Sequence, residues 1–268
     1  MSGLPVRLVE KPWGIDALPA PFVAEPGRRI GEIWFEPPAD LPSILIKYIF
    51  TSEKLSVQVH PDDTQAKAAG ETDSGKEECW LVFHAEPGAT LGIGFDAPID
   101  AAAMRTAALD GSIERLMTWH PVRPGDFFYI PAGTVHAIGA GVGLIEIQQN
   151  SDITYRLYDY GRPRALHLEA GIAVARGEPY SPALHRRIAE TGTIELANGR
   201  YFQAHRIEGL ADAALRAIYS GPVAILPRKG AVRIGDQIVR PGECTVTHGL
   251  DAVRFDEGGQ AIVVRART

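Results

Sequence analysis

GDFFYIPAGTVH, residues 125–136, combines a short strand, a tight turn and a histidine. The aromatic and β-branched run that follows Gly125 is typical of a β-strand. Pro131 and Gly133 are turn residues that end this strand. His136 then begins the next strand, and we expect its side chain to point back toward strands formed earlier in the chain. The segment therefore predicts a β structure in which His136 faces residues that are distant in sequence.

Two earlier segments carry further side chains that suit a metal site. In the stretch SVQVH, alternate side chains of a strand share a face, so Gln58 and His60 point the same way. In the later stretch GKEECW, the same alternation places Lys76 and Glu78 on one face. Two imidazoles, a carboxylate and an amide oxygen form a suitable ligand set for a divalent metal. The sequence therefore predicts a metal site formed by Gln58, His60, Glu78 and His136.

Short strands and turns account for most of the remaining chain, which contains 28 glycines and 20 prolines. Residues 62–70 are polar and alanine-rich, which indicates one or two helical turns. Residues 99–118 show helical spacing of apolar side chains, and Asp100 and Ser112 occupy N-cap positions. We therefore expect a mainly β fold with two short helices inserted between strands.

The turn sequence VRPGD at residues 122–126 recurs as VRPGE at residues 239–243. Pro-Gly followed by an acidic residue is typical of a tight turn, and each copy leads into a strand-like segment. The second copy has no comparable histidine and carboxylate cluster nearby. The chain is therefore divided into three predicted parts: a metal-binding domain over residues 1–177 with a helical insert at about 99–118, a linker over 178–192, and a degenerate β domain over 193–268.

The composition excludes several classes of function. The formal net charge is −6 and there is no lysine- or arginine-rich run, so a nucleic-acid partner is not expected. No apolar run is long enough to span a membrane. The only two cysteines, Cys79 and Cys244, are too few for a disulfide framework, which indicates reduced thiols and a cytoplasmic protein. A small molecule is therefore the expected ligand.

The segment 125–136 matches the second motif of the cupin family, although Ala140 replaces the asparagine that usually closes it. In the first motif the usual His-x-His is replaced by Gln58-Val-His60, as in type I mannose-6-phosphate isomerases. Further agreement comes from KPWG at residues 11–14, LSVQVHPDD at 55–63 and NSDITYRLYDYGR at 150–162. Over about residues 5–175 the chain resembles the short bacterial branch of this isomerase family.

This resemblance implies a cupin barrel, a double-stranded β-helix or jelly roll, followed by a second degenerate cupin-like unit. It also implies one Zn²⁺ (zinc) ion per chain, and conversion between mannose 6-phosphate and fructose 6-phosphate through a cis-enediolate. The active-site positions of the family fall on Lys76, Glu146 and Arg156. Strand alternation places Glu146 and Gln148 on one face, which would line the barrel interior.

The same residues are also compatible with two other functions. Two histidines and a carboxylate also describe non-haem iron oxygenases, and the ligand set accepts manganese, cobalt or iron. A phosphosugar-binding regulator without turnover would keep the same barrel. Six further histidines lack ligand partners at useful spacing and are interpreted as structural or surface residues: His84, His120, His167, His185, His205 and His248.

Overall fold

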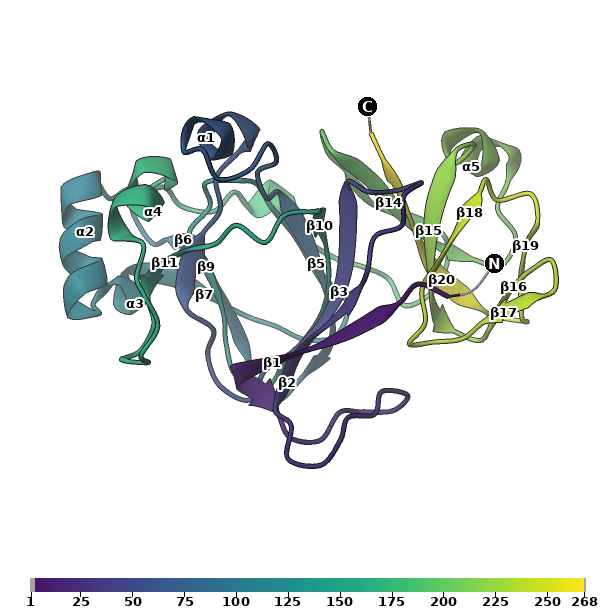
Figure 1. The fold of residues 1–268 in the computed structure, drawn as a ribbon, viewed down its shortest axis with the longest axis horizontal. Coiled ribbons are helices and arrows are strands. Elements are labelled where there is room, and N and C mark those ends of the chain that lie inside the picture. The colour runs from purple at the N-terminus through teal and green to yellow at the C-terminus, as the bar shows by residue number, and fades with distance from the viewer. Residues whose placement is uncertain (1–2, 268) are drawn as a thin grey trace.

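The first part of the chain forms two antiparallel β-sheets that face each other (Figure 1). The computed structural model describes residues 3–267. The larger sheet has seven strands, in the order β1 (Val6–Ile15), β2 (Ile30–Phe35), β3 (Ile44–Phe50), β10 (Val142–Gln149), β5 (Glu78–Ala85), β8 (Asp126–Ile130) and β12 (His185–Arg187). The smaller sheet has five, in the order β11 (Tyr155–Tyr158), β4 (Val57–Val59), β9 (His136–Ile138), β6 (Thr90–Phe95) and β7 (Met117–Pro121).

The second part of the chain is a smaller pair of antiparallel sheets, the yellow-green half of Figure 1. One sheet has the order β13 (Ile194–Asn198), β14 (Phe202–Glu208), β20 (Gln260–Ala266), β15 (Pro222–Lys229) and β18 (Thr245–His248). The other has the order β17 (Gln237–Val239), β16 (Val232–Ile234) and β19 (Val253–Phe255). The predicted mainly β fold is therefore confirmed.

The seven-stranded sheet is covered on both of its faces. Its inner face packs against the five-stranded sheet, and Trp80 and Leu144 belong to the apolar core between them. Its outer face packs against the second unit, where Ile145 shares one core with Phe202 and Ile262. Every residue of β2, β3 and β10 is consequently buried. The β10 side chains that face inward are therefore largely removed from bulk solvent.

Helices cover the outer face of the five-stranded sheet. α2 (Ala101–Asp110) and α4 (Leu168–Val174) pack there, and Met104 shares a core with Val57 and Leu157. The two helices predicted within residues 99–118 are confirmed as α2 and α3 (Ile113–Leu116). The remaining helices are α1 (Asp63–Ala68), α5 (Ala213–Ile218) and the short 3₁₀ helix η1 (Pro182–Leu184).

The start of α2 provides a test of the predicted helix caps. The Asp100 carboxylate accepts a hydrogen bond from the Ala103 backbone N–H at 2.8 Å, whereas Ser112 makes no capping hydrogen bond. We expect Asp100→Ala to lower the free energy of unfolding by about 1 kcal/mol, because one backbone donor loses its partner. Ser112→Ala is the control, and urea unfolding should show a smaller change. Equal losses in the two variants would contradict the capping role of Asp100.

The segment 178–192, expected as a linker, is partly a strand. β12 pairs with β8, with His185 opposite Phe128 in the register. The two rings are stacked, with centroids 4.2 Å apart and planes within 1° of parallel. The segment has little hydrophobic periodicity because β12 is a three-residue edge strand held by its neighbour. Among residues 3–267, no helix has the length and apolar character needed to cross a membrane.

The repeated VRPG(D/E) sequence forms the same turn twice. Gly125 and Gly242 both have positive φ, 94° and 90°, which favours glycine. In the first copy the Arg123 backbone N–H donates to Asp126 Oδ2 at 2.9 Å. In the second copy the Arg240 backbone N–H donates to Glu243 Oε2 at 2.7 Å. The sequence repeat is therefore a structural repeat at this turn.

Candidate metal centre and substrate cavity

Three strands that are distant in sequence bring the predicted metal ligands together. His60 follows β4, Glu78 begins β5, and His136 begins β9. All three side chains are buried, and one ligand atom from each lies within 4.8 Å of the other two. The pairing of Gln58 with His136 across β4 and β9 sets the register on one side of this group. The convergence predicted for His60, Glu78 and His136 is therefore confirmed.

Both imidazole rings are oriented by backbone carbonyls. His60 Nδ1 lies 2.7 Å from the Ile153 carbonyl oxygen, and His136 Nδ1 lies 2.9 Å from that of Thr134. A carbonyl can only accept, so each Nδ1 carries the proton and each Nε2 keeps a lone pair. Burial lowers the pKa of His136 to about 4, so this ring is neutral near pH 7. Neutral Nε2 atoms are the form in which histidine binds a metal.

The Glu78 carboxylate lies between these two rings. Its Oε1 is 3.5 Å from His136 Nε2, and its Oε2 is 3.7 Å from His60 Nε2. Oε1 is buried with no hydrogen-bond partner among the described residues, which is costly for a carboxylate oxygen unless a cation binds it. Burial, together with the nearby Glu146 carboxylate, raises the pKa of Glu78 to about 7. Two nitrogen donors and this oxygen fit a divalent metal ion.

A line of alternating charges leads away from Glu78. Lys76 Nζ lies 2.8 Å from Glu78 Oε2 and 3.6 Å from Glu146 Oε1. Lys47 Nζ lies 3.3 Å from the same Glu146 oxygen and 3.8 Å from Glu32 Oε2. Burial raises the pKa of Glu146, but the ammonium groups of Lys76 and Lys47 outweigh it and lower the pKa to about 2. Glu146 is therefore held as a carboxylate between two cations.

A cavity of about 320 Å³ opens next to the metal ligands. Gln58, Lys76 and Glu146 line it on the side of the metal group. Arg156 also lines it, because β11 pairs with β4 and places Arg156 opposite Gln58. Lys76, Glu146 and Arg156, the three residues proposed for catalysis from the sequence, therefore share one cavity, and Lys76 links it to the metal group through its contact with Glu78.

Comparisons with known proteins show what this chain resembles. No family model matches the chain. The mannose-6-phosphate isomerase of Streptococcus mutans is 36% identical over 217 residues, which cover 74% of this chain and 68% of the relative. The mannose-6-phosphate isomerase ManA of Bacillus subtilis is 37% identical over 183 residues, covering 65% of this chain and 58% of the relative. The chain belongs to the mannose-6-phosphate isomerase family.

A solved structure of the family has the same fold over almost the whole chain. The crystal structure of the mannose 6-phosphate isomerase from Bacillus subtilis superposes with a TM-score of 0.81 at 25% identity. The match covers 98% of this chain and 98% of that one. The second β unit is therefore part of the architecture shared with this isomerase, including the region that the sequence motifs do not reach.

The structure also adds cavity residues that sequence reasoning missed in this isomerase. His167, interpreted from the sequence as structural or surface, lines the cavity and accepts a hydrogen bond at Nδ1 from the Arg156 backbone N–H. That interpretation missed the cavity because the nine-residue segment 159–167 brings His167 back to β11, and strand alternation cannot predict this return. Arg164 lines the cavity too, and the buried Asp159 holds its guanidinium at 2.6 Å. In the sequence, the charge pattern of residues 150–164 is the only feature that could have indicated that Arg164 lies in the cavity.

Two residues close to the metal ligands, Cys79 and Gln58, differ in their relation to the group. Cys79 is buried in the core on the outer face of β5, so its thiol faces away from the metal group. Gln58 lies next to the group, with its amide nitrogen 3.2 Å from His136 Nε2 and its Oε1 accepting from Ser56 Oγ. A half-turn of the amide would direct Oε1 toward the metal group instead.

Proposed function

We propose that this chain interconverts mannose 6-phosphate and fructose 6-phosphate by moving a proton between C1 and C2 of the sugar. The observation that carries the proposal is the buried His60–Glu78–His136 group, which contacts Lys76 in the wall of a cavity that also contains Arg156. The proton to be removed is only weakly acidic, so the cis-enediolate that forms needs electrostatic stabilisation. A phosphosugar is the substrate class that needs both a metal and an anion-binding end.

The architecture supports a finer assignment of the fold and of the domains. We propose that the two facing sheets of residues 1–177 form a cupin barrel, a double-stranded β-helix, and that residues 193–268 form a degenerate cupin-like unit. The shared turn at residues 122–126 and 239–243 supports a common origin of the two units. Residues 178–192 then connect the units and supply β12 to the first sheet.

We propose Zn²⁺ as the metal, one ion per chain, held by His60, Glu78 and His136 with Gln58 as a fourth ligand. Nitrogen and oxygen donors in a buried, four-residue group suit zinc, and the two carbonyl-bound rings are the arrangement expected around a metal. When bound, the ion supplies Lewis-acid stabilisation of negative charge on the substrate oxygens. The cytoplasm stays the predicted location, consistent with two buried free cysteines.

Lys76 and Glu146 are proposed as the proton-transfer pair. Both line the cavity, and their charged groups lie 3.6 Å apart. Lys76 can donate a hydrogen bond to the substrate oxygen that becomes anionic. When its ammonium group turns from Glu146 to the substrate, the pKa of Glu146 rises, and this carboxylate can then accept a proton from carbon. Trp80 Nε1 donates to Glu146 Oε2 at 3.2 Å, which fixes the direction of the carboxylate.

Arg156 is proposed to hold the anionic end of the substrate, together with Arg164 and His167. Asp159 holds Arg164 through two hydrogen bonds of 2.6 Å, so this cation is positioned before substrate arrives. A guanidinium matches a phosphate in geometry as well as in charge. Among the described residues, neither Arg156 nor Arg164 forms an ion pair with a metal ligand. A mutation of either arginine is therefore expected to affect phosphate binding without affecting metal binding.

We expect Arg156→Ala to retain its metal and to lose about 10- to 100-fold in kcat/KM, because one charge-assisted hydrogen bond is removed. The measurement is turnover of mannose 6-phosphate, with metal content determined on the same preparation. Arg105→Ala is the control, because Arg105 lies on α2 and forms an exposed ion pair with Glu169. An Arg156→Ala enzyme with full activity would refute the anion-binding role.

A non-haem iron oxygenase, the alternative function of the same ligand set, would consume oxygen in the presence of Fe²⁺ and substrate. Lys76, Gln58 and Arg156 give the cavity a polar, anion-accepting lining, which suits a phosphosugar. Protein reloaded with Fe²⁺ is therefore expected to show no substrate-dependent oxygen uptake. Protein reloaded with Zn²⁺ is expected to isomerise mannose 6-phosphate, and binding of the sugar without any turnover would favour a regulator instead.

A further inference from the structure

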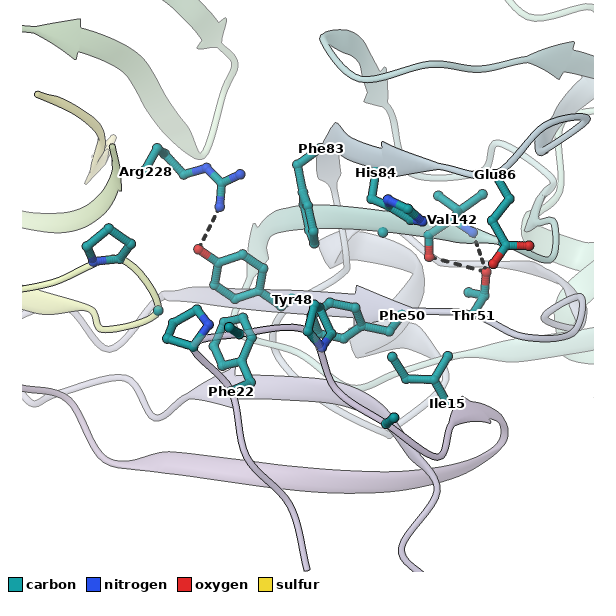
Figure 2. A pocket seen from close by; sticks show the side chains of 18 residues that line it. Ile15, Phe22, Tyr48, Phe50, Thr51, Phe83, His84, Glu86, Val142 and Arg228 are labelled. Atoms are coloured by element: carbon teal, nitrogen blue, oxygen red, sulfur yellow. Dashed lines mark hydrogen bonds between the residues drawn. The ribbon is translucent and has the colours of Figure 1, made fainter. Parts of the chain in front are cut away.

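A second cavity lies between the two β units, outside the metal site. Its volume is about 560 Å³, within the range of small-molecule sites, and such sites often occur where domains meet. Phe22, Tyr48 and Phe83 form its walls on the side of the first unit, and Arg228 lies on the side of the second (Figure 2). Gly242 of the second unit also lines it. The cavity plays no part in the isomerisation proposed above.

The wall of this cavity is a cluster of aromatic rings in edge contact. The centroids of Phe22 and Tyr48 are 4.8 Å apart, and those of Tyr48 and Phe83 are 5.5 Å apart, both in edge-to-face geometry. Phe50 completes the cluster at 5.8 Å from Phe83. Aromatic walls favour a flat apolar ligand, which gains area burial together with ring contacts. A sugar phosphate, which is polar on all sides, does not suit these walls.

One cation lies in this aromatic environment. Arg228 is half-buried, its Nη1 donates to Tyr48 Oη at 2.8 Å, and its guanidinium carbon is 5.1 Å from the centroid of Phe83 (Figure 2). Within residues 3–267 no carboxylate lies within ion-pair distance of Arg228. A partly desolvated guanidinium with free donors favours an anion, above all a carboxylate that it can bind with two hydrogen bonds.

The opposite end of the cavity has different polarity. His84 and Glu86 lie there, away from Arg228 (Figure 2). The Glu86 carboxylate repels an anion at that end, so a ligand with one anionic group is oriented toward Arg228. A ligand with a single carboxylate and an apolar body therefore matches the cavity in one orientation.

The backbone around the cavity is adapted to close contact between the units. A Cβ atom at Gly242 would lie 2.4 Å from Pro21 Cγ, and Gly242 has a φ of 90°. Only glycine allows the loop that carries Pro21 and Phe22 to close against the second unit here. This loop supplies one wall of the cavity, so the cavity depends on the contact between the two units.

We propose that this inter-unit cavity binds a small aromatic carboxylate, with its ring against the wall formed by Phe22, Tyr48 and Phe83 and its carboxylate on Arg228. The strand β3 separates this site from the reaction cavity. Its alternation places Tyr48 in the inter-unit cavity and the adjacent Lys47 beside Glu146 on the inner face. The two cavities therefore share a strand but no lining residue.

The probes for this site are 2-naphthoate and the uncharged 2-naphthamide, titrated by calorimetry into the full, metal-loaded chain. We expect naphthoate to bind at least about tenfold more tightly, because only the carboxylate pairs with Arg228. Arg228→Met is expected to remove this preference, and Arg228→Lys to keep part of it. Arg233→Met is the control, because Arg233 is an exposed cation of the second unit outside the cavity.

Binding of naphthoate to the metal itself must be distinguished from this site. We therefore expect the naphthoate affinity to be unchanged in His136→Ala and in protein treated with a chelator. Phe83→Ala should weaken both probes, because the ring contact is common to both. Equal affinity for the two probes, an unchanged preference in Arg228→Met, no preference in Arg228→Lys, or loss of binding with the metal would each overturn the proposal.

Discussion

Replacement of His136 with alanine is expected to remove the metal and the activity together. His136 supplies one of two neutral imidazole nitrogens in a buried group, and without it one histidine, one carboxylate and the Gln58 amide would remain. Loss of a residue that merely supports a ligand already costs 10- to 100-fold in metal affinity, so loss of the ligand itself should exceed about 100-fold. The measurement is metal content after gel filtration, followed by mannose 6-phosphate turnover.

His205→Ala is the matched control for this experiment. His205 is also buried, but it lies in the second unit and its ring bonds to Tyr219 Oη at 2.8 Å. We expect this variant to lose stability while it keeps its metal. A His136→Ala protein that binds metal as tightly as the unaltered chain would show that the ligand group has been wrongly assigned.

Lys76→Met is expected to lower kcat by about 10²- to 10⁴-fold without removal of the metal, because an acid–base residue contributes in this range. Methionine keeps much of the side-chain length of lysine but cannot donate a hydrogen bond or carry charge. The ammonium group of Lys76 is within 4 Å of both Glu78 and Glu146, so its loss affects proton transfer directly. The measurement is steady-state isomerisation with metal content held at one ion per chain.

Lys54→Met provides the comparison for Lys76→Met. Lys54 is half-exposed and forms an ion pair with Glu114 away from the cavity, and such pairs contribute little. Its activity should stay within about twofold of the unaltered chain. An equal loss of activity in the two lysine variants would show that the loss in Lys76→Met does not result from its position in the site.

Much of the site could be predicted because strand alternation is a local rule. The parity of β10 predicted that Glu146 and Gln148 share a face, and both are buried opposite Ile145 and Ile147, which pack against the second unit. The turn after β8 predicted the position of His136 for the same reason. These relations depend on a few neighbouring residues.

The residues that sequence reasoning missed depend on contacts between distant segments. His167 reaches the cavity because its loop returns to β11, and Glu32 faces Lys47 because β2 and β3 pair in one particular register. β12 could not be recognised because a three-residue edge strand lacks a hydrophobic pattern of its own. In each case the deciding information is the tertiary arrangement.

The covered outer face of the seven-stranded sheet gives the second unit a structural role, although the described residues of this unit contain no group suited to a metal. Without residues 193–268, the aromatic and aliphatic side chains on the outer face of β3 and β10 would form a large apolar surface exposed to water. An exposed apolar surface of this kind promotes self-association of the protein. The C-terminal unit therefore has a structural role that is independent of the reaction, because it keeps this apolar face away from solvent.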